Sequence, residues 1–146
     1  MRRFLIPLLV AALSLAGVVV TADALVTTPS EELDAFVDDV TATRAEKRMD
    51  AALSYVNPSE VPCRFSSEGK LTEYGEGEGS ALSDALRSSL GVFDSEQQEA
   101  LQQSVEMHED MATVTTRVGD AEYEQTVIYE LVRREERWLV RAVRTL

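Results

Sequence analysis

The sequence predicts an α+β domain, in which N-terminal helices pack on one face of a curved antiparallel sheet that ends in a four-stranded C-terminal meander. Two observations lead to this prediction. Apolar residues recur at helical spacing between residues 31 and 56. Over residues 101–146 they alternate with polar residues, which is the period of a strand with one buried face. Helices followed by a run of strands is the element order of an α+β domain.

The first 24 residues have the layout of a secretory signal peptide. Arg2 and Arg3 precede the uncharged residues 4–20, and Ala22 and Ala24 form an A-x-A cleavage motif. An uncleaved membrane anchor is the alternative, because this apolar stretch approaches the about 20 residues that a membrane span needs. Both interpretations predict that residues 25–146 are exported across the cytoplasmic membrane, either as a periplasmic or secreted domain or as one anchored through residues 4–20.

Residues 31–56 are predicted to be helical, with Ser30 as the N-cap and a bend or break between Thr41 and Arg48. Serine suits an N-cap, and the two glutamates that follow it suit the positive end of the helix dipole. The apolar repeat changes phase within this segment, and one straight helix would overhang a strand of ordinary length. An Asn-Pro pair then ends the pattern.

A short hairpin over residues 61–74 and a helix over residues 81–90 are predicted next. Val61, Cys63 and Phe65 alternate with polar residues before a turn that contains Gly69. Gly91 suits the position just after a helix. The apolar residues that this helix would bury are Leu82, Leu86 and Leu90.

Three two-residue turns, at 109–110, 119–120 and 135–136, would divide the last part of the chain into four strands. The pairings that follow include Leu101 with Val118, Val105 with Val114, Ala112 with Val127, Leu131 with Val140, and Tyr129 with Ala142. The predicted inner face carries Leu101, Val105, Met107, Ala112, Val114, Val118, Tyr123, Val127, Tyr129, Leu131, Trp138, Val140 and Ala142. The outer face carries mostly charged residues and threonines, together with Ile128, Val132, Leu139 and Val143. A slip of one residue at any turn would mix the two sets.

Composition excludes several classes of function. The formal net charge is −12, whereas nucleic-acid binding needs a basic surface. Cys63 is the only cysteine and His108 the only histidine, so an internal disulfide and a Cys/His zinc site are both excluded. The glycine fingerprint of a nucleotide site is absent from the sequence, and we expect no cofactor.

Two stretches resemble a known superfamily. "RMDAALSYV", from Arg48 to Val56, is similar to the second helix of the nuclear transport factor 2-like superfamily, which folds as a cystatin-like α+β cone. "VIYELVRREERWLVRAVRTL", from Val127 to Leu146, is similar to its closing hairpin, in which a Trp begins the last strand. The turn departs from the family, which usually has Asp-Gly or Asn-Gly where this chain has Glu135-Glu136. The resemblance implies that residues 25–146 form one cone-like domain.

The resemblance also implies a pocket inside the cone. Some members of the superfamily, such as ketosteroid isomerase, polyketide cyclases and epoxide hydrolases, place acids and tyrosines there. The inner sheet face predicted for this chain has no Asp, Glu or His. Its amides and phenols can orient a ligand but are poor general bases near neutral pH. The side chains that could line the pocket are Tyr55, Gln103, Thr116, Tyr123, Gln125, Tyr129 and Trp138.

The resulting hypothesis is a small exported, non-enzymatic domain that binds a partner protein or a small apolar ligand. Two alternatives stay open: an enzyme of the isomerase, cyclase or hydrolase type with an acid placed elsewhere in the cone, and a membrane-anchored interaction module. The four apolar residues of the outer face are compatible with a homodimer interface, and equally with the scattered apolar residues of an ordinary surface.

Overall fold

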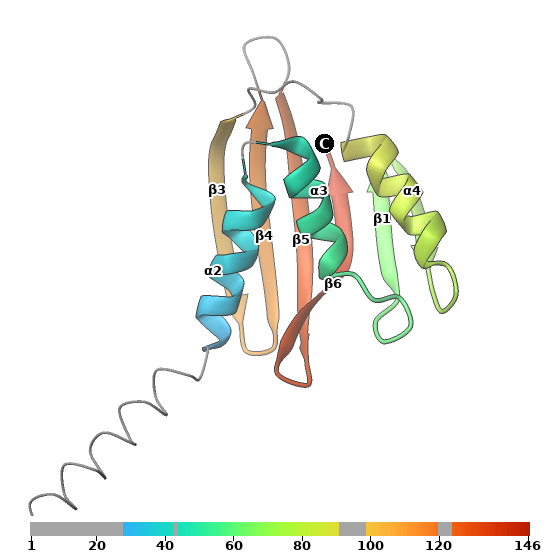
Figure 1. The fold of residues 1–146 in the computed structure, drawn as a ribbon, viewed down its shortest axis with the longest axis horizontal. Coiled ribbons are helices and arrows are strands. Elements are labelled where there is room, and N and C mark those ends of the chain that lie inside the picture. Colours follow the sequence, from blue (N-terminus) through green and yellow to red (C-terminus); the bar gives the residue numbers. More distant parts are fainter. Residues whose placement is uncertain (1–27, 43, 91–98, 120–123) are drawn as a thin grey trace, which may run out of the picture.

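The computed structural model describes residues 28–42, 44–90, 99–119 and 124–146. In this part of the chain, helices cover one face of a six-stranded sheet, which confirms the predicted α+β class (Figure 1). The helices are α2 (Pro29–Val40), α3 (Ala45–Ser54) and α4 (Gly79–Leu90). The strands are β1 (Cys63–Ser67), β2 (Lys70–Tyr74), β3 (Glu99–His108), β4 (Met111–Gly119), β5 (Glu124–Arg134) and β6 (Arg137–Thr145).

The sheet has the order β2-β1-β6-β5-β4-β3, so the last strand lies in its interior. The predicted meander is confirmed, because β3 to β6 pair in succession and antiparallel. The sheet as a whole is mixed rather than wholly antiparallel, since β1 runs parallel to β6 and sets Phe65 opposite Val143. This parallel pair joins the β1–β2 hairpin to the meander.

The expected break between the first two helices is confirmed, since α2 ends at Val40 and α3 begins at Ala45. The predicted N-cap, Ser30, is wrong, because the cap is Thr28. The hydroxyl of Thr28 accepts a hydrogen bond from the Glu31 backbone N–H, and the Glu31 carboxylate accepts one from the Thr28 N–H. Pro29 occupies the first helical position, where its missing N–H costs no helical hydrogen bond.

The predicted hairpin and the third helix are both present. β1 and β2 meet at a Glu68-Gly69 turn, and α4 begins at Gly79 rather than Ala81. Leu82 and Leu86 are fully buried, whereas Leu90 is half-buried at the end of the helix. The predicted C-terminal Gly91 lies outside the described residues.

Two of the three predicted turns are confirmed and one is wrong. The turns at 109–110 and 135–136 set Val105 opposite Val114 and Leu131 opposite Val140, as expected. The middle turn is longer than predicted, since β4 ends at Gly119 and β5 begins at Glu124. Ala112 therefore pairs with Leu131 instead of Val127. The register shift is even, so every side chain of β4 and β5 keeps its predicted face.

Two bulges change the predicted register. An irregularity in β3 sets Ala100, rather than Leu101, opposite Val118. A second irregularity, at Arg141 in β6, sets Tyr129 opposite Val143 rather than Ala142. One extra residue reverses the alternation of faces beyond it. Val143 is therefore buried on the inner face, and Ala142 lies on the outer face, the reverse of the prediction.

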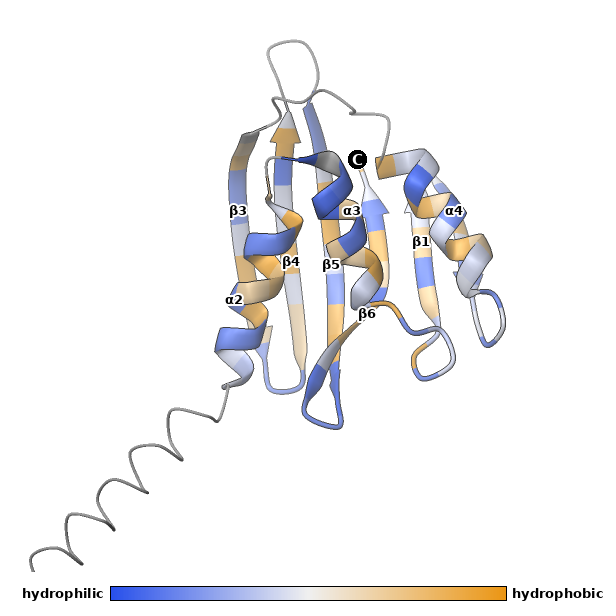
Figure 2. Ribbon diagram, viewed as in Figure 1, coloured by the Kyte–Doolittle hydropathy of each residue, from blue (hydrophilic) through white to orange (hydrophobic). Residues whose placement is uncertain are grey.

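The main core lies between the helices and the inner face of the sheet, where Trp138, Leu131 and Val114 are all buried. Figure 2 shows hydrophobic residues, in orange, on the helices and on the strands that they cover. Val105 and Met107 share this face but are exposed, because β3 is the edge strand. On the outer face, Val61 packs with Val132 and Leu139 in a second buried cluster. Val132 and Leu139 were predicted to lie on the exposed outer face, but the loop before β1, which contains Val61, covers them.

Among the described residues, no helix is long and apolar enough to cross a membrane. The predicted signal peptide or anchor, residues 1–24, lies outside the described residues.

Candidate functional site

In the described part of the chain, side chains pack closely against the centre of the inner sheet face. Tyr129, Trp138 and Thr116 are all buried there. The ring of Phe36 from α2 meets the ring of Tyr129 edge-on, with 5.4 Å between centroids. The Trp138 Nε1–H donates a hydrogen bond of 2.9 Å to the carbonyl oxygen of Pro29. Three of the predicted pocket residues are therefore buried, and two of them, Tyr129 and Trp138, join the sheet to α2.

A buried arginine lies near Tyr129. Arg48 of α3 donates a hydrogen bond of 2.6 Å from Nη1 to the carbonyl oxygen of Ala42, which stabilises the break between α2 and α3. Burial lowers the pKa of Arg48, an effect that the nearby Tyr129 opposes. Burial raises the pKa of Tyr129 well above its ordinary value, and the Arg48 charge offsets only part of this. The Tyr129 phenol stays protonated at neutral pH, so it can donate a hydrogen bond but cannot act as a base.

The other predicted pocket residues lie in different environments. Tyr55 is half-buried, and its ring meets Phe36 edge-on at 4.8 Å. Burial, and then the charges of Asp39 and Glu32, raise the pKa of the Tyr55 phenol. Gln103 is exposed on the edge strand β3. Tyr123 lies outside the described residues.

Gln125 is the predicted residue that lines a cleft. This cleft, of about 720 Å³, lies between α4, the β1–β2 hairpin and the end of β6. Its polar lining consists mainly of Ser67, Thr72, Ser88, Ser89, Gln125 and Thr145. Its apolar surface comes from Phe65, Tyr74 and Ala85, with Leu146 at the rim. Glu68 and Lys70 are exposed at the tip of the hairpin.

The fold explains why these side chains converge. Ser67 and Thr145 come from the parallel pair β1 and β6, and the Thr145 hydroxyl donates a hydrogen bond of 2.9 Å to the Ser67 hydroxyl. Gln125 reaches from β5 to α4, where its Nε2 donates a hydrogen bond of 3.3 Å to the carbonyl oxygen of Ser89. Leu82 and Leu86 anchor α4 in the core, so the serines of its last turns face the cleft. Most of these hydroxyl residues were missed by the sequence prediction, which did not pair β1 with β6.

Three described residues with general-base or nucleophilic chemistry lie outside this cleft. His108 is exposed at the end of β3, as the predicted outer face required. Burial raises the pKa of the Cys63 thiol to about 12, so the reactive thiolate is suppressed at neutral pH. Asp50 is exposed and forms an ion pair of 3.3 Å with Arg87. Within the described ranges, no group of His, Cys, Asp and Glu side chains is placed to hold a metal ion.

Solved structures share this fold at low sequence identity. A nuclear transport factor 2-like protein of unknown function from Shewanella oneidensis MR-1 superposes with a TM-score of 0.56 at 11% identity, over 81% of this chain and 98% of that chain. One from Shewanella baltica OS155 gives a TM-score of 0.53 at 17% identity, over 83% and 97%. A protein from Shewanella frigidimarina NCIMB 400 that carries a provisional ketosteroid isomerase name gives a TM-score of 0.54 at 12% identity, over 76% of this chain and 91% of that chain.

These likenesses show that the chain has the nuclear transport factor 2-like fold, which confirms the resemblance found in the sequence. At such low identities they show the fold alone. No protein-family model matches the sequence, and no curated protein matches it.

Proposed function

We propose that this nuclear transport factor 2-like domain is a non-catalytic binding domain, which takes a small uncharged ligand in the cleft between α4 and the β1–β2 hairpin. The observation that carries the proposal is the cleft itself. Its volume of about 720 Å³ lies within the range of about 300–1,000 Å³ that small-molecule sites occupy.

The lining defines the class of ligand. Hydroxyls and one amide supply hydrogen bonds, while Phe65 and Tyr74 supply apolar and aromatic contact area. The two charged side chains of the lining are exposed at the hairpin tip, so a buried ionic group of the ligand would have no counter-charge there. A ring compound with hydroxyl or carbonyl substituents fits this surface better than the wholly apolar ligand expected from the sequence.

Absence of catalysis is part of the proposal. The acidic member of the cleft lining is Glu68, on the exposed tip of the hairpin, where solvent competes for any proton transfer. Tyr74 is the phenol of the lining, and a phenol is a weak general base near neutral pH. A ligand placed in the cleft would therefore be held and oriented by these groups rather than converted.

Export is also part of the proposal, and it is supported by the arginines, apolar stretch and A-x-A motif of residues 1–24. Mass spectrometry of the protein isolated from its native membrane and secreted fractions tests it. A chain that begins at Leu25 in the exported fraction is the expected result. An intact N-terminus in the membrane fraction would support the anchored alternative.

A matched pair of variants tests the cleft. Ser88 lines the cleft, and its hydroxyl donates a hydrogen bond to the carbonyl oxygen of Ala85; Ser54 on α3 makes the same bond to Ala51 and does not line the cleft. We expect uncharged fragments with a hydroxyl or carbonyl group, screened by ligand-observed NMR, to bind the wild type and the Ser54→Trp variant. Binding should be lost in Ser88→Trp. Equal binding by both variants would refute the cleft as the site.

A further inference from the structure

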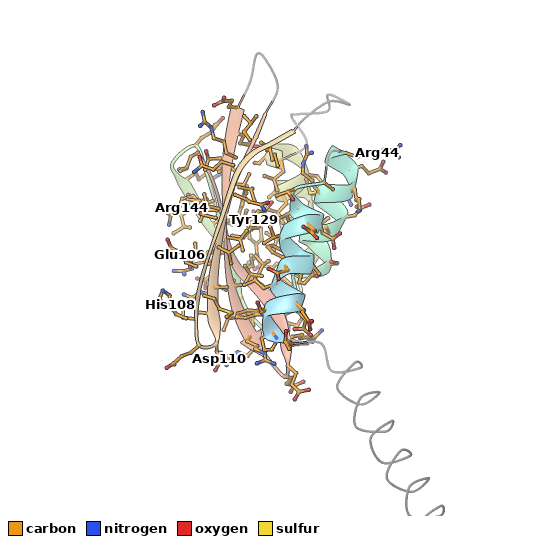
Figure 3. All side chains as sticks on the ribbon, turned by 90° about the vertical axis from the view of Figure 1, so that its left-hand side faces the viewer. Arg44, Glu106, His108, Asp110, Tyr129 and Arg144 are labelled. Atoms are coloured by element: carbon orange, nitrogen blue, oxygen red, sulfur yellow. The ribbon has the colours of Figure 1, made fainter. Side chains whose placement is uncertain are left out.

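The outer face of the sheet carries a small hollow, on the side opposite the cleft. Figure 3 shows Arg144, Glu106 and His108 pointing away from the helices, whereas Tyr129 points toward them. The hollow lies where β1, β5 and β6 adjoin, with Ile128 and Ala142 among its lining residues and Leu71 of β2 beside them. The Leu71 side chain is exposed at 65%, although it is large and apolar.

Arginines surround this hollow. Arg64 and Arg141 approach the same carboxylate oxygen of Glu130, at 3.5 and 3.6 Å. Arg144 also lines the hollow, and within the described part of the chain it lies within ion-pair distance of no carboxylate. Glu73 of β2 lies opposite Arg64 on the same face, so three guanidinium groups face two carboxylates there, in a chain whose 26 acidic residues outnumber its 14 Lys and Arg residues. The hollow is a local site of excess positive charge.

The size of the hollow indicates what it can accept. At about 120 Å³ it is well below the volume of about 300 Å³ at which small-molecule sites begin. It can take a single apolar side chain presented by a larger molecule. Planar guanidinium groups match the geometry of carboxylates, and arginine is enriched at protein interfaces.

We propose that this hollow is a docking site for an acidic segment of a partner protein. The segment inserts one apolar side chain beside Leu71 and Ile128, and its carboxylates pair with Arg64 and Arg144. This site is separate from the ligand cleft, which opens on the inner face of the sheet.

A second copy of the chain fits this site poorly. Two outer faces packed together would bring the same arginines into opposition, which costs energy. The acidic helix α2 offers the exposed carboxylates of Glu31, Asp34 and Asp38, but its large apolar residues are buried in its own core. It therefore has no large apolar side chain to insert. Burial of Val132, Leu139 and Val143 also removes most of the apolar surface on which the predicted homodimer interface depended.

A fluorescein-labelled peptide of alternating Asp and Glu with one central Leu tests the proposal. Its binding to the full-length protein is measured by fluorescence anisotropy. We expect binding that weakens as salt is added, because the rim contacts are ionic. Replacing the central Leu with Ser should weaken binding, and replacing the acids with Asn and Gln should abolish it. Absence of salt-sensitive binding by the acidic peptide would overturn the proposal.

Variants with matched controls distinguish this site from general attraction to basic residues. Arg144→Glu should weaken peptide binding about tenfold or more, as expected of an interface hot spot. Arg134→Glu, at another exposed arginine at the far end of β5, should change it little. Leu71→Ala should weaken binding, whereas Met111→Ala, at another exposed apolar residue, should not. Thermal unfolding of each variant confirms that it is folded.

A membrane surface is the competing partner. Vesicles of phosphatidylcholine with and without phosphatidylglycerol test it by co-sedimentation. Equal losses for Arg144→Glu and Arg134→Glu, or binding to the anionic vesicles without binding to the peptide, would overturn the proposal. Neither result would bear on the ligand-cleft proposal, because that proposal is tested by Ser88→Trp on the opposite face of the sheet.

Discussion

Replacing Glu136 with glycine should stabilise the protein, because the turn between β5 and β6 holds two glutamates in a strained conformation. Their φ angles are +46° at Glu135 and +69° at Glu136, in the left-handed region. Both central residues of this type of hairpin turn need a positive φ, and glycine is favoured at the second. An L-residue in this region costs about 1–2 kcal/mol of strain, which glycine would relieve. The greater freedom of glycine in the unfolded chain opposes this gain by about 0.4–1 kcal/mol.

The net gain expected for Glu136→Gly is therefore about 0.5–1 kcal/mol. With an m-value of about 2 kcal/mol/M, the urea midpoint should rise by about 0.3–0.5 M. Trp138, the only tryptophan, is buried in the core and reports unfolding by its fluorescence. Circular dichroism provides an independent signal, because Trp138 lies close to the changed turn.

Two controls separate backbone strain from other effects. Glu136→Ala removes the same charge but keeps a Cβ, so it should leave the midpoint nearly unchanged. Glu73→Gly places glycine within strand β2, at a position without a positive φ, and should lower stability by about 0.5–1 kcal/mol. If Glu136→Gly destabilised the protein as Glu73→Gly does, or if Ala and Gly had equal effects at position 136, the reasoning from strain would be refuted.

Three further predictions concern the core and the first helix. Trp138→Phe should cost about 1–3 kcal/mol in urea unfolding followed by circular dichroism, because the carbonyl of Pro29 loses its hydrogen-bond donor; a change near zero would contradict this. Cys63 should resist thiol reagents at pH 8 until the protein unfolds, since burial raises the pKa of its thiol to about 12. Because the pKa is raised in the folded state, the stability contributed by the protonated thiol is complete below the ordinary thiol pKa and is lost as pH rises toward 12. Thr28→Ala should raise the pKa of Glu31 in an NMR titration, because hydrogen bonds from the Thr28 backbone and side chain lower that pKa; the capping box therefore stabilises α2 above the ordinary carboxyl pKa and loses this effect as pH falls through the lowered value.

Local patterns in the sequence were sufficient for most of the sheet. Alternation along the strands predicted the inner and outer faces of β4 and β5 correctly, although the turn between them was too short. A shift by an even number of residues leaves the faces unchanged, so the error did not propagate. The bulge at Arg141 did reverse the faces, exchanging Ala142 and Val143, because its position depends on pairing with β5 rather than on any signal in β6.

Contacts between distant segments could not be predicted in this way. The parallel pairing of β1 with β6 brings Ser67 beside Thr145 and builds one wall of the cleft, and sequence periodicity gives no indication of such a partner. The loop before β1 likewise buries Leu139, because Val61 packs against it. Alternation along β6 had placed Leu139 on the outer face, which was expected to be exposed to solvent. Of the residues predicted to line a pocket, Gln125 alone is found in the cleft lining among the described residues.

The interior position of β6 has a consequence for how the chain reaches its native state. The hydrogen bond between Trp138 and Pro29 spans 109 positions, and the one between Thr145 and Ser67 spans 78. Closing such long loops costs entropy before any contact compensates for it, so domains with many distant pairings fold slowly, over about milliseconds to seconds. The helices and the β1–β2 hairpin are synthesised first, and their apolar faces stay exposed to water, or to a chaperone, until the final strand arrives between the two halves of the sheet.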